Sequence, residues 1–253
     1  MPKLSALERQ AQIVELLSKN EKMKVMELAD YFQVSRETIR RDMNALNKAG
    51  SLKKWFVGSE PVYDFKTQPV HTRMTEAQES KMKISRKLLE FIPEHAFLYL
   101  DTGSTILCFA KLLKEHSGYT VITNSIPVVN ELVDSGNELI ITGGTINPRV
   151  MSAMGAQTTS FLKCIKVDVA VLGSSGFDHH EGPSSNTFDD SQIKQVVIKN
   201  AQTNIVVADS RKATYSSFTQ YASWKEIDHL ITDDGISTEV AQRLSEFTDV
   251  IIV

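Results

Sequence analysis

The stretch Val34-Ser35-Arg36-Glu37-Thr38-Ile39-Arg40-Arg41-Asp42-Met43-Asn44-Ala45-Leu46 decides how the N-terminal part of the chain folds. Ser35 suits the position before a helix, because its hydroxyl accepts from a first-turn amide that has no intrahelical partner. Ile39, Met43 and Leu46 follow at helical spacing, which places them on one face. The stretch therefore predicts an amphipathic helix that begins after Ser35 and packs through a single apolar stripe.

Polar and cationic side chains occupy the first two turns of this helix. A helix that reads the major groove of DNA has this division, since its N-terminal residues reach base edges. An apolar pattern at residues 25–32 precedes it by a short turn, and two helices joined in this way form a helix-turn-helix. We also expect a helix at residues 5–19, and Gly50 as the end of the Ser35 helix. The predicted DNA contacts are Ser35, Arg36, Glu37, Thr38, Arg40 and Arg41.

Residues 51–58 are strand-like and basic, and they are expected to form a small wing beside the helices. Lys53 and Lys54 are placed to contact phosphates of the DNA backbone. Trp55 and Phe56 have a simpler interpretation, which is packing of the wing against the helices.

Charge is distributed unevenly along the 253-residue chain. Residues 1–58 carry 11 Lys and Arg against 7 Asp and Glu, whereas the whole chain has a net charge of −3. A basic head on an acidic body suits contact with a polyanion at one end, although an uneven solvated surface would look similar. There is no signal-like segment and no apolar run of membrane-spanning length, so we expect a cytoplasmic protein without a membrane partner. Cys108 and Cys164 are expected to be reduced, packed thiols.

Three domains or segments are expected from these patterns. Residues 1–58 form the winged helix-turn-helix and residues 79–253 form the larger domain. Residues 59–78 lack periodicity and contain Pro61 and Pro69, which predicts a linker or hinge.

The larger domain repeats an apolar run, a small polar turn and a helical pattern. The apolar runs cover residues 97–100, 119–122, 139–141, 167–172, 204–207, 229–231 and 250–253. Strands that alternate with helices predict an α/β fold with a largely parallel sheet covered on both faces.

Ligands of such sheets bind beyond the carboxyl ends of the strands, where this sequence places small and polar residues repeatedly. Asp101-Thr102-Gly103-Ser104-Thr105 is the clearest case, because a glycine, two hydroxyls and a helix N-terminus favour a phosphate. An ordinary helix start is the alternative for that motif, and a surface ion pair is the alternative for Asp209 with Lys212. The residues expected at this edge are Asp101, Gly103, Ser104, Thr105, Asn124, Ser125, Gly143, Gly144, Ser174, Ser175, Asp209 and Lys212.

No metal or catalytic group is expected. His179-His180-Glu181 lies in a polar loop, and no distant Cys or His has the spacing of further ligands. We recognise no nucleophile–histidine–acid arrangement and expect no cofactor.

These motifs resemble the DeoR-type repressors of bacterial sugar operons over essentially the whole chain. Val34-Ser35 followed by Thr38-Ile39-Arg40-Arg41-Asp42 resembles the helix-turn-helix signature of that family. Six further motifs resemble family motifs in the same order, namely residues 101–105, 123–125, 143–144, 168–176, 208–212 and 232–234.

The resemblance implies a winged helix-turn-helix joined to an effector domain similar to ribose-5-phosphate isomerase and glucosamine-6-phosphate deaminase. It also implies a phosphorylated sugar as effector and assembly as a homodimer or homotetramer. Lys81, which follows Glu79, and Lys194 match lysines of the family pattern, although solvated helix lysines are the ordinary alternative. Two departures are Trp55-Phe56-Val57-Gly58-Ser59, where the family commonly has His-Gly-Gly, and Ser175, where Asn or Asp is common.

The leading hypothesis is thus a repressor, not an enzyme, that binds double-stranded operator DNA and leaves it when a sugar phosphate binds. One alternative is a sugar-phosphate isomerase or deaminase with an accessory head, in which Asp168, Asp178, Glu181 or Asp209 would act as acid or base. Another is an architectural DNA-binding protein whose body only dimerises and binds no effector.

Overall fold

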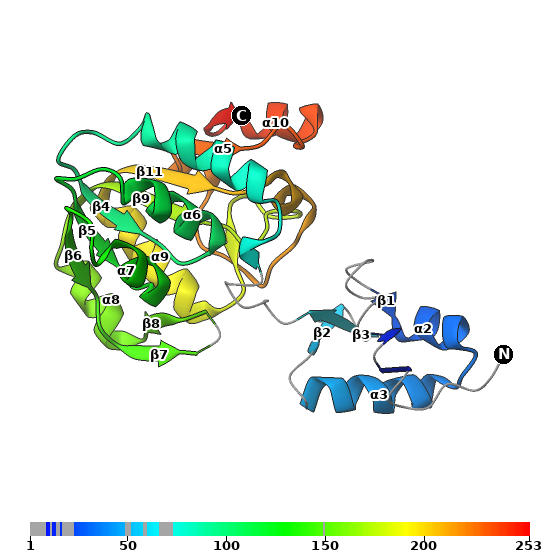
Figure 1. Cartoon of the computed structure of the whole chain (residues 1–253). Coiled ribbons are helices and arrows are strands. Elements are labelled where there is room, and N and C mark those ends of the chain that lie inside the picture. Colours follow the sequence, from blue (N-terminus) through cyan, green and yellow to red (C-terminus); the bar gives the residue numbers. More distant parts are fainter. Residues whose placement is uncertain are drawn as a thin grey trace. The chain divides into compact units, whose positions relative to one another are not determined.

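The computed structural model describes residues 9–10, 12–13, 16, 23–48, 52–57, 60–65, 73–148 and 150–253. The chain divides into two compact units, Met1–Gln68 and Pro69–Val253. Figure 1 shows both units, and each is described by itself. The expected helix at residues 5–19 and its end at Gly50 lie largely outside the described residues.

The N-terminal unit contains the predicted pair of helices, α2 (Val25–Phe32) and α3 (Arg36–Lys48). Gln33 makes the turn between them with a left-handed φ of 51°. Ile39 and Met43 of α3 are completely buried against Leu28 of α2 and Ile13. The apolar stripe that the sequence predicts therefore does hold α3, and the helix-turn-helix is confirmed.

A small antiparallel sheet completes this unit. It has the order β1-β3-β2, with β1 at Met23–Lys24, β2 at Leu52–Val57 and β3 at Glu60–Phe65. The strand β3 lies inside the range that the sequence assigned to a linker. Pro61 stands opposite Phe56 in a strand with a partner on each side, so the proline did not prevent strand formation.

The C-terminal unit is built on seven strands that all run parallel, in the order β14-β13-β11-β9-β4-β5-β6. Their bounds are Phe97–Leu100 (β4), Thr120–Thr123 (β5), Glu138–Ile141 (β6), Val167–Gly173 (β9), Ala201–Val207 (β11), His229–Thr232 (β13) and Asp249–Ile252 (β14). On one side of β4 the sheet continues through β5 to β6, and on the far side of β9 it continues through β11 and β13 to β14. These two strands are neighbours, and the point between them is where ligands of such sheets bind.

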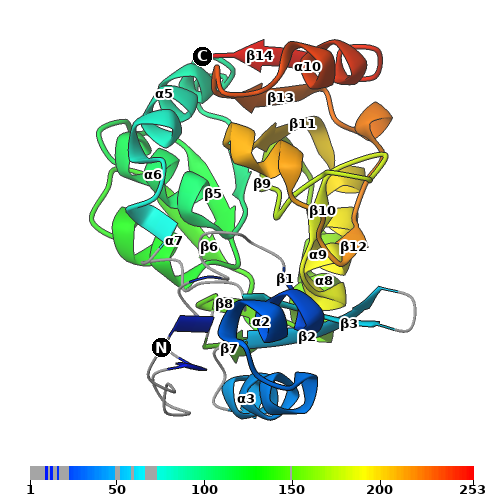
Figure 2. The ribbon, with the colours of Figure 1, turned by 90° about the vertical axis from the view of Figure 1, so that its right-hand side faces the viewer.

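Helices cover both faces of this sheet, as Figure 2 shows. On one face lie α5 (Gln78–Leu89), α6 (Ser104–Leu113) and α7 (Ile126–Leu132), and their apolar residues pack against Leu98 and Val171. On the other face lie α8 (Ala156–Lys163), α9 (Phe188–Asn200) and α10 (Thr238–Leu244), packed around Tyr99 and Leu172. Successive strand residues thus face opposite layers, which explains the continuous apolar runs in the sequence.

Short elements occupy the connections. They are the pair β7 (Thr145–Asn147) and β8 (Ser152–Met154), the pair β10 (Ser184–Ser185) and β12 (Thr219–Gln220), and the 3-10 turns Ser210–Thr214 and Trp224–Glu226. Among the described helices, none is long and apolar enough to cross a membrane.

Asp42 supports a stability prediction for the N-terminal unit. Its carboxylate is buried, accepts from Arg9 Nε at 2.5 Å and accepts from Gln10 Nε2 at 3.0 Å. Asp42→Ala should lower the free energy of local unfolding of α3 by about 3 kcal/mol or more, because the buried Arg9 guanidinium loses the Asp42 carboxylate. Amide hydrogen exchange of α3 in the full chain measures this.

Glu37→Ala is the matched control, because it breaks the exposed 3.9 Å pair with Arg41 on the same helix. That change should cost less than about 0.5 kcal/mol. Equal losses for the two variants would show that the buried pair does not hold α3.

Candidate functional site

The recognition helix begins where the sequence predicts. Ser35 Oγ accepts from the Thr38 amide at 3.1 Å and lies 2.9 Å from the Thr38 hydroxyl. The Ser35 cap is therefore confirmed, and it fixes the direction of the first turn of α3.

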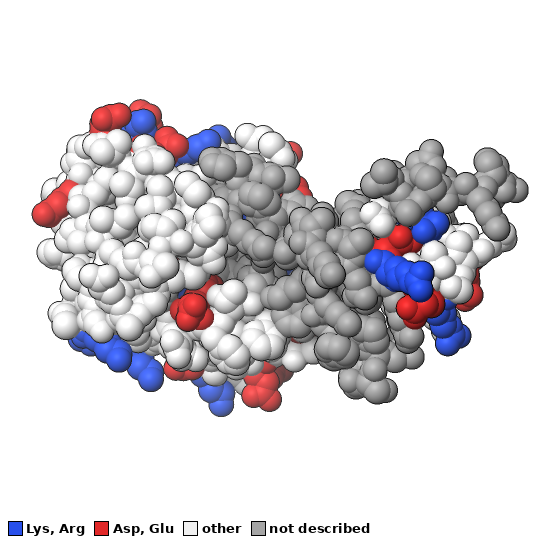
Figure 3. Space-filling model, turned by 90° about the horizontal axis from the view of Figure 1, so that it is seen from below, with Lys and Arg blue, Asp and Glu red and all other residues white. Residues whose placement is uncertain are grey.

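The first turns of α3 carry exposed charge. Arg36, Glu37 and Arg41 are exposed, whereas Asp42 on the same helix is buried. On the face of this unit drawn in Figure 3, Lys and Arg side chains lie beside Asp and Glu side chains. The side chains of Arg40, Lys53 and Lys54 lie outside the described part of the structure.

A buried ion pair marks the point between β4 and β9 in the C-terminal unit. Lys194 of α9 donates to Asp101 Oδ2, to Asp190 Oδ2 at 3.3 Å and to the Gly173 carbonyl at 3.2 Å. An ammonium has three N–H bonds, so these acceptors engage all of them. Burial alone lowers the pKa of Lys194, but the two carboxylates together raise it above its ordinary value. Lys194 is thus a buried lysine with three acceptors and not the solvated lysine of the alternative interpretation.

Two carboxylate oxygens around Lys194 lack donors. Asp101 Oδ2 also accepts from the Gly173 amide at 2.9 Å, whereas Asp101 Oδ1 has no hydrogen-bond partner among the described residues. Asp190 Oδ2 accepts from Ser185 Oγ at 2.5 Å, whereas Asp190 Oδ1 is likewise buried without a partner. Buried acceptors of this kind favour a ligand that brings hydroxyl donors.

The N-terminus of α6 retains free donors. Gly103 precedes it with a φ of +129°, and a Cβ added there would meet nothing within 4 Å. Within the described residues, the first backbone hydrogen bond of the helix is donated by the Leu107 amide to the Gly103 carbonyl. The amides before Leu107 therefore have no helical carbonyl as partner. The Ser104 and Thr105 hydroxyls make no hydrogen bond with the described residues. These groups and the helix dipole together suit an anion.

Charged residues gather in the turn after β11. Arg211 donates to Asp209 Oδ1 at 2.7 Å and to Asp209 Oδ2 at 3.2 Å. Although burial opposes it, the Arg211 hydrogen bond holds the pKa of Asp209 below its usual value. Burial lowers the pKa of Lys212, whose ammonium lies 5.4 Å from the Tyr215 ring centre. The described residues give that ammonium no ion pair or hydrogen bond.

Lys81 is also buried, on α5. Its ammonium donates to the Arg73 carbonyl and, at 2.7 Å, to the Glu76 carbonyl. Burial lowers the pKa of Lys81 to about 8. The lysine therefore holds the backbone before α5, and this role could not be read from the helical spacing.

The polar residues after β5 and β6 support the scaffold. Asn124 is completely buried, accepts from the Tyr99 hydroxyl at 3.0 Å and donates to the Ala153 carbonyl at 3.1 Å. Ser125 caps α7 by accepting from the Val128 amide at 3.4 Å. Their side chains join elements of the fold and leave few atoms for a ligand.

The predicted turn glycines and serines are engaged in a similar way. The Gly143 carbonyl accepts from Thr158 Oγ1 at 2.6 Å. A Cβ added to Gly144 would lie 2.3 Å from Thr158 Oγ1, so the backbone packs closely against that side chain. Ser174 Oγ donates to the Gly176 carbonyl at 2.9 Å, and Ser175 Oγ accepts from Asn186 Nδ2 at 3.1 Å.

The residues considered for an enzyme do not converge. Asp168 lies at the start of β9, where it accepts from the Phe97 amide at 2.8 Å, so it is at the opposite end of the strand from Gly173. Asp178 and Glu181 line a separate groove of about 450 Å³ with His179 and His180. Within the described residues, no group of His, Cys, Asp or Glu is arranged to hold a metal ion.

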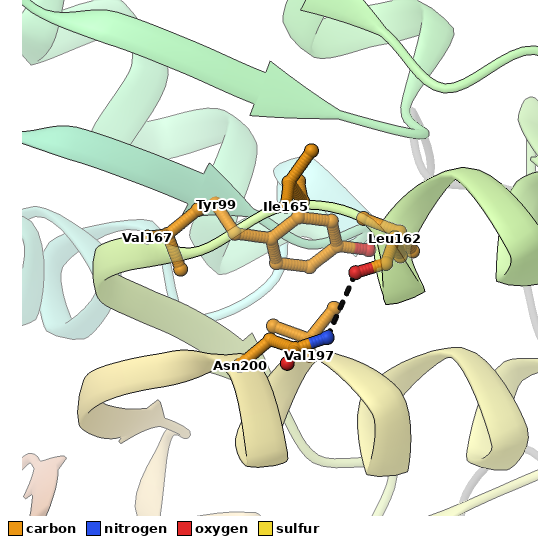
Figure 4. A pocket seen from close by; sticks show the side chains of 6 residues that line it. All are labelled: Tyr99, Leu162, Ile165, Val167, Val197 and Asn200. Carbon is orange, nitrogen blue, oxygen red and sulfur yellow. Dashed lines mark hydrogen bonds between the residues drawn. The ribbon is translucent and has the colours of Figure 1, made fainter.

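The small hollow in Figure 4 does not serve as an effector site either. It measures about 10 Å³, and Tyr99, Asn200 and four aliphatic side chains around them line it. The Asn200 amide beside it donates to the Leu162 carbonyl at 2.9 Å. That volume holds about one water molecule at most.

Comparison with known proteins identifies the two units. Residues 9–60 match the DeoR-like helix-turn-helix domain, and residues 76–234 match the DeoR C terminal sensor domain. The chain belongs to the DeoR family. This DeoR-family chain is 29% identical to the HTH-type transcriptional regulator GlpR of Haloferax volcanii, over 94% of this chain and 93% of the relative. It is 28% identical to the glycerol-3-phosphate regulon repressor of Escherichia coli K12, over 92% and 93%.

The sensor domain also has a structural neighbour among enzymes. Ribose 5-phosphate isomerase A from Neisseria gonorrhoeae aligns with a TM-score of 0.41 and 18% identity, over 57% of this chain and 56% of the isomerase. The DeoR-family sequence relatives are transcriptional regulators, as predicted.

Sequence reasoning missed four residues of this site: Arg73, Glu76, Asp190 and Arg211. Asp190 precedes Lys194 by four positions on α9, a spacing that pairs side chains on a helix and was available as a signal. Arg211 lies two residues after Asp209. Arg73 and Glu76 fell within the segment interpreted as a linker, so nothing local marked them.

The Lys194 cluster leads to a stability prediction. Lys194→Met should lower the unfolding free energy of the full chain by about 3–5 kcal/mol, because Asp101 and Asp190 would remain buried without their cation. The double variant Lys194→Met with Asp101→Asn should recover part of that loss. Urea denaturation measures both.

Lys87→Met is the control, since the Lys87 ammonium pairs with Glu90 at 2.6 Å on the surface. Its loss should stay below about 1 kcal/mol. A Lys194→Met protein as stable as this control would contradict the assigned role of the buried pair.

Proposed function

We propose that this DeoR-family chain is a cytoplasmic repressor of a carbohydrate-utilisation operon that a phosphorylated sugar releases from operator DNA. The observation that carries the proposal is a set of groups at one edge of the sheet that make no hydrogen bond with the described residues. They are the Ser104 and Thr105 hydroxyls, the α6 amides and the Lys212 ammonium. The name of the Escherichia coli relative, a glycerol-3-phosphate regulon repressor, supports a phosphorylated effector of this kind.

The phosphate is assigned to the donors of this edge. Dipole and amides at the α6 N-terminus attract a dianion, and Gly103 leaves the space open for it. The Lys212 backbone lies beside the turn after β9, because the Phe177 amide donates to the Lys212 carbonyl at 3.0 Å. Gly173, at the end of the same strand, lies against the Thr102 carbonyl.

The sugar hydroxyls are assigned to the carboxylates. Asp101 Oδ1 and Asp190 Oδ1 accept nothing from the described residues, and carboxylates repel a phosphate but accept from hydroxyl groups. Lys194 pairs with both acids and holds their side chains in place. The effector therefore binds with its phosphate toward α6 and Lys212 and with its polyol end toward α9.

The head is assigned to operator DNA. Exposed Arg36 and Arg41 on α3, with Arg40, Lys53 and Lys54, supply phosphate and base contacts, and Ser35, Glu37 and Thr38 supply polar contacts at the start of the helix. A homodimer or homotetramer presents two such helices to the half-sites of one operator. The effector acts by favouring a conformer whose heads do not match that spacing.

The recognition helix supports a prediction on DNA binding. Arg41→Ala should weaken binding to the duplex upstream of the protein's own coding region about 10- to 100-fold, the effect of losing one charged contact at a groove. Sugar-phosphate affinity should not change. Electrophoretic mobility shifts measure the first quantity and calorimetry the second.

Lys111→Ala, which removes an exposed cation from α6 in the sensor domain, controls for net charge. Loss of DNA binding in this control as well would show that overall charge, and not the recognition helix, governs the interaction.

The α6 N-terminus supports a prediction on effector binding. Ser104→Ala combined with Thr105→Ala should abolish the rise in melting temperature that phosphorylated sugars cause, while operator affinity without effector stays the same. A ligand that binds only the folded state raises the melting temperature, so thermal shift against a panel of sugar phosphates is the measurement.

Thr238→Ala at the exposed start of α10 is the matched control. A thermal shift that persists in the double variant would place the phosphate elsewhere. Turnover of a sugar phosphate by the wild-type protein would contradict the regulatory function.

A further inference from the structure

The segment Arg73–Ala77 directly precedes α5, and several residues of the sensor domain bind it. Lys81 donates to two of its carbonyls, at Arg73 and Glu76, and is only 2% exposed. The Glu76 amide donates to the Arg73 carbonyl at 3.3 Å, and Ala77 adopts a left-handed φ of 45°. The segment is thus a tight turn fastened to a buried ammonium.

Charged side chains add a second grip. Glu76 Oε2 lies 3.3 Å from Arg211 Nη1. Arg211 in turn holds Asp209 through two hydrogen bonds. The half-buried Arg73 guanidinium lies within electrostatic range of Asp190 and Asp209, which belong to α9 and to the turn after β11. These charged residues also interact electrostatically with Lys212, to which the phosphate is assigned.

The two carboxylates on Arg211 are held with different strength. Asp209 is buried, with a side chain 3% exposed, and pairs through both oxygens, whereas Glu76 is 39% exposed and pairs through one oxygen. An anion that arrives beside Lys212 and Arg211 competes with the weaker of these contacts. Glu76 is the residue that such an anion displaces.

We propose that Glu76 is an internal competitor of the effector's phosphate: it occupies Arg211 in the effector-free protein, and its displacement loosens the Arg73–Ala77 segment that leads to the DNA-binding unit. This inference rests on the proposed function, because it assumes that an anion binds at this edge of the sheet. It assigns the coupling between effector and linker to one ion pair, and the coupling acts in both directions.

Inorganic phosphate is the probe for the test, with chloride at equal ionic strength as reference. Glu76→Gln in the full chain keeps the shape of the side chain and removes its charge. We expect calorimetry to show phosphate binding about two- to fivefold tighter than in the wild type, the range that a partly exposed ion pair supports. We also expect phosphate to speed amide hydrogen exchange at residues 73–77 in the wild type but less so in the variant.

Glu79→Gln is the matched control, because Glu79 is exposed in the first turn of α5, three residues away, and carries the same charge. It should leave phosphate affinity at the wild-type value, which separates the specific competition from a general change in net charge. Equal phosphate affinities for the Glu76 and Glu79 variants would overturn the inference, as would unchanged exchange at residues 73–77.

Failure of the proposed function looks different. In that case wild-type protein binds no phosphate, or binds it equally well after Ser104→Ala with Thr105→Ala. If the wild type binds phosphate at α6 and the Glu76 variant behaves like the Glu79 control, only the competition is wrong.

Discussion

The buried ion pair between Asp101 and Lys194 fixes the place where the two halves of the parallel sheet diverge. Asp101 follows β4 and Lys194 lies in α9, and between them the end of β9 contributes the amide and carbonyl of Gly173. Charges removed from water must be paired and hydrogen-bonded. The pair therefore requires β4, β9 and α9 to meet with correct geometry. It also fixes the position of the α6 N-terminus, which begins three residues after Asp101.

The polar residues on the two sides of this ion pair differ in the hydrogen bonds that they already make. Beyond β5 and β6, the polar atoms of Asn124 and Ser125 satisfy the tyrosine, the backbone and the start of α7. Beyond β4 and β11, hydroxyls, amides and the Lys212 ammonium have no such duties within the described residues. Asp101 Oδ1 and Asp190 Oδ1 are buried without a partner among the described residues. Buried polar atoms without partners are costly, which favours a ligand that brings donors to this edge.

Local patterns predicted the parallel sheet and the recognition helix but not β3, which lies in the segment interpreted as a linker. Alternating apolar runs and helical patterns give a parallel α/β sheet, and the Ser35 cap with Ile39 and Met43 gives the recognition helix. Site residues were harder, because a sequence shows which side chains are near a strand end but not which hydrogen bonds they already make. Asn124, for example, already bonds to Tyr99 and to the Ala153 carbonyl. The Glu76–Arg211 contact joins residues 135 positions apart, and no local pattern predicts such a pair.

The N-terminal unit repeats the arrangement of the sensor domain on a smaller scale. Asp42 lies in the most specific part of the signature, yet it is buried on Arg9 and Gln10 instead of facing solvent. Neighbouring Arg36 and Arg41 remain exposed. In both units a buried carboxylate with a cationic partner orders the scaffold. The groups assigned to ligands lie on the adjoining helix in each case, Arg36 and Arg41 on α3 and Ser104 and Thr105 on α6. Because the ordering cost of those groups is met by the fold, a ligand that reaches them need not supply it again, which favours binding to a preformed surface.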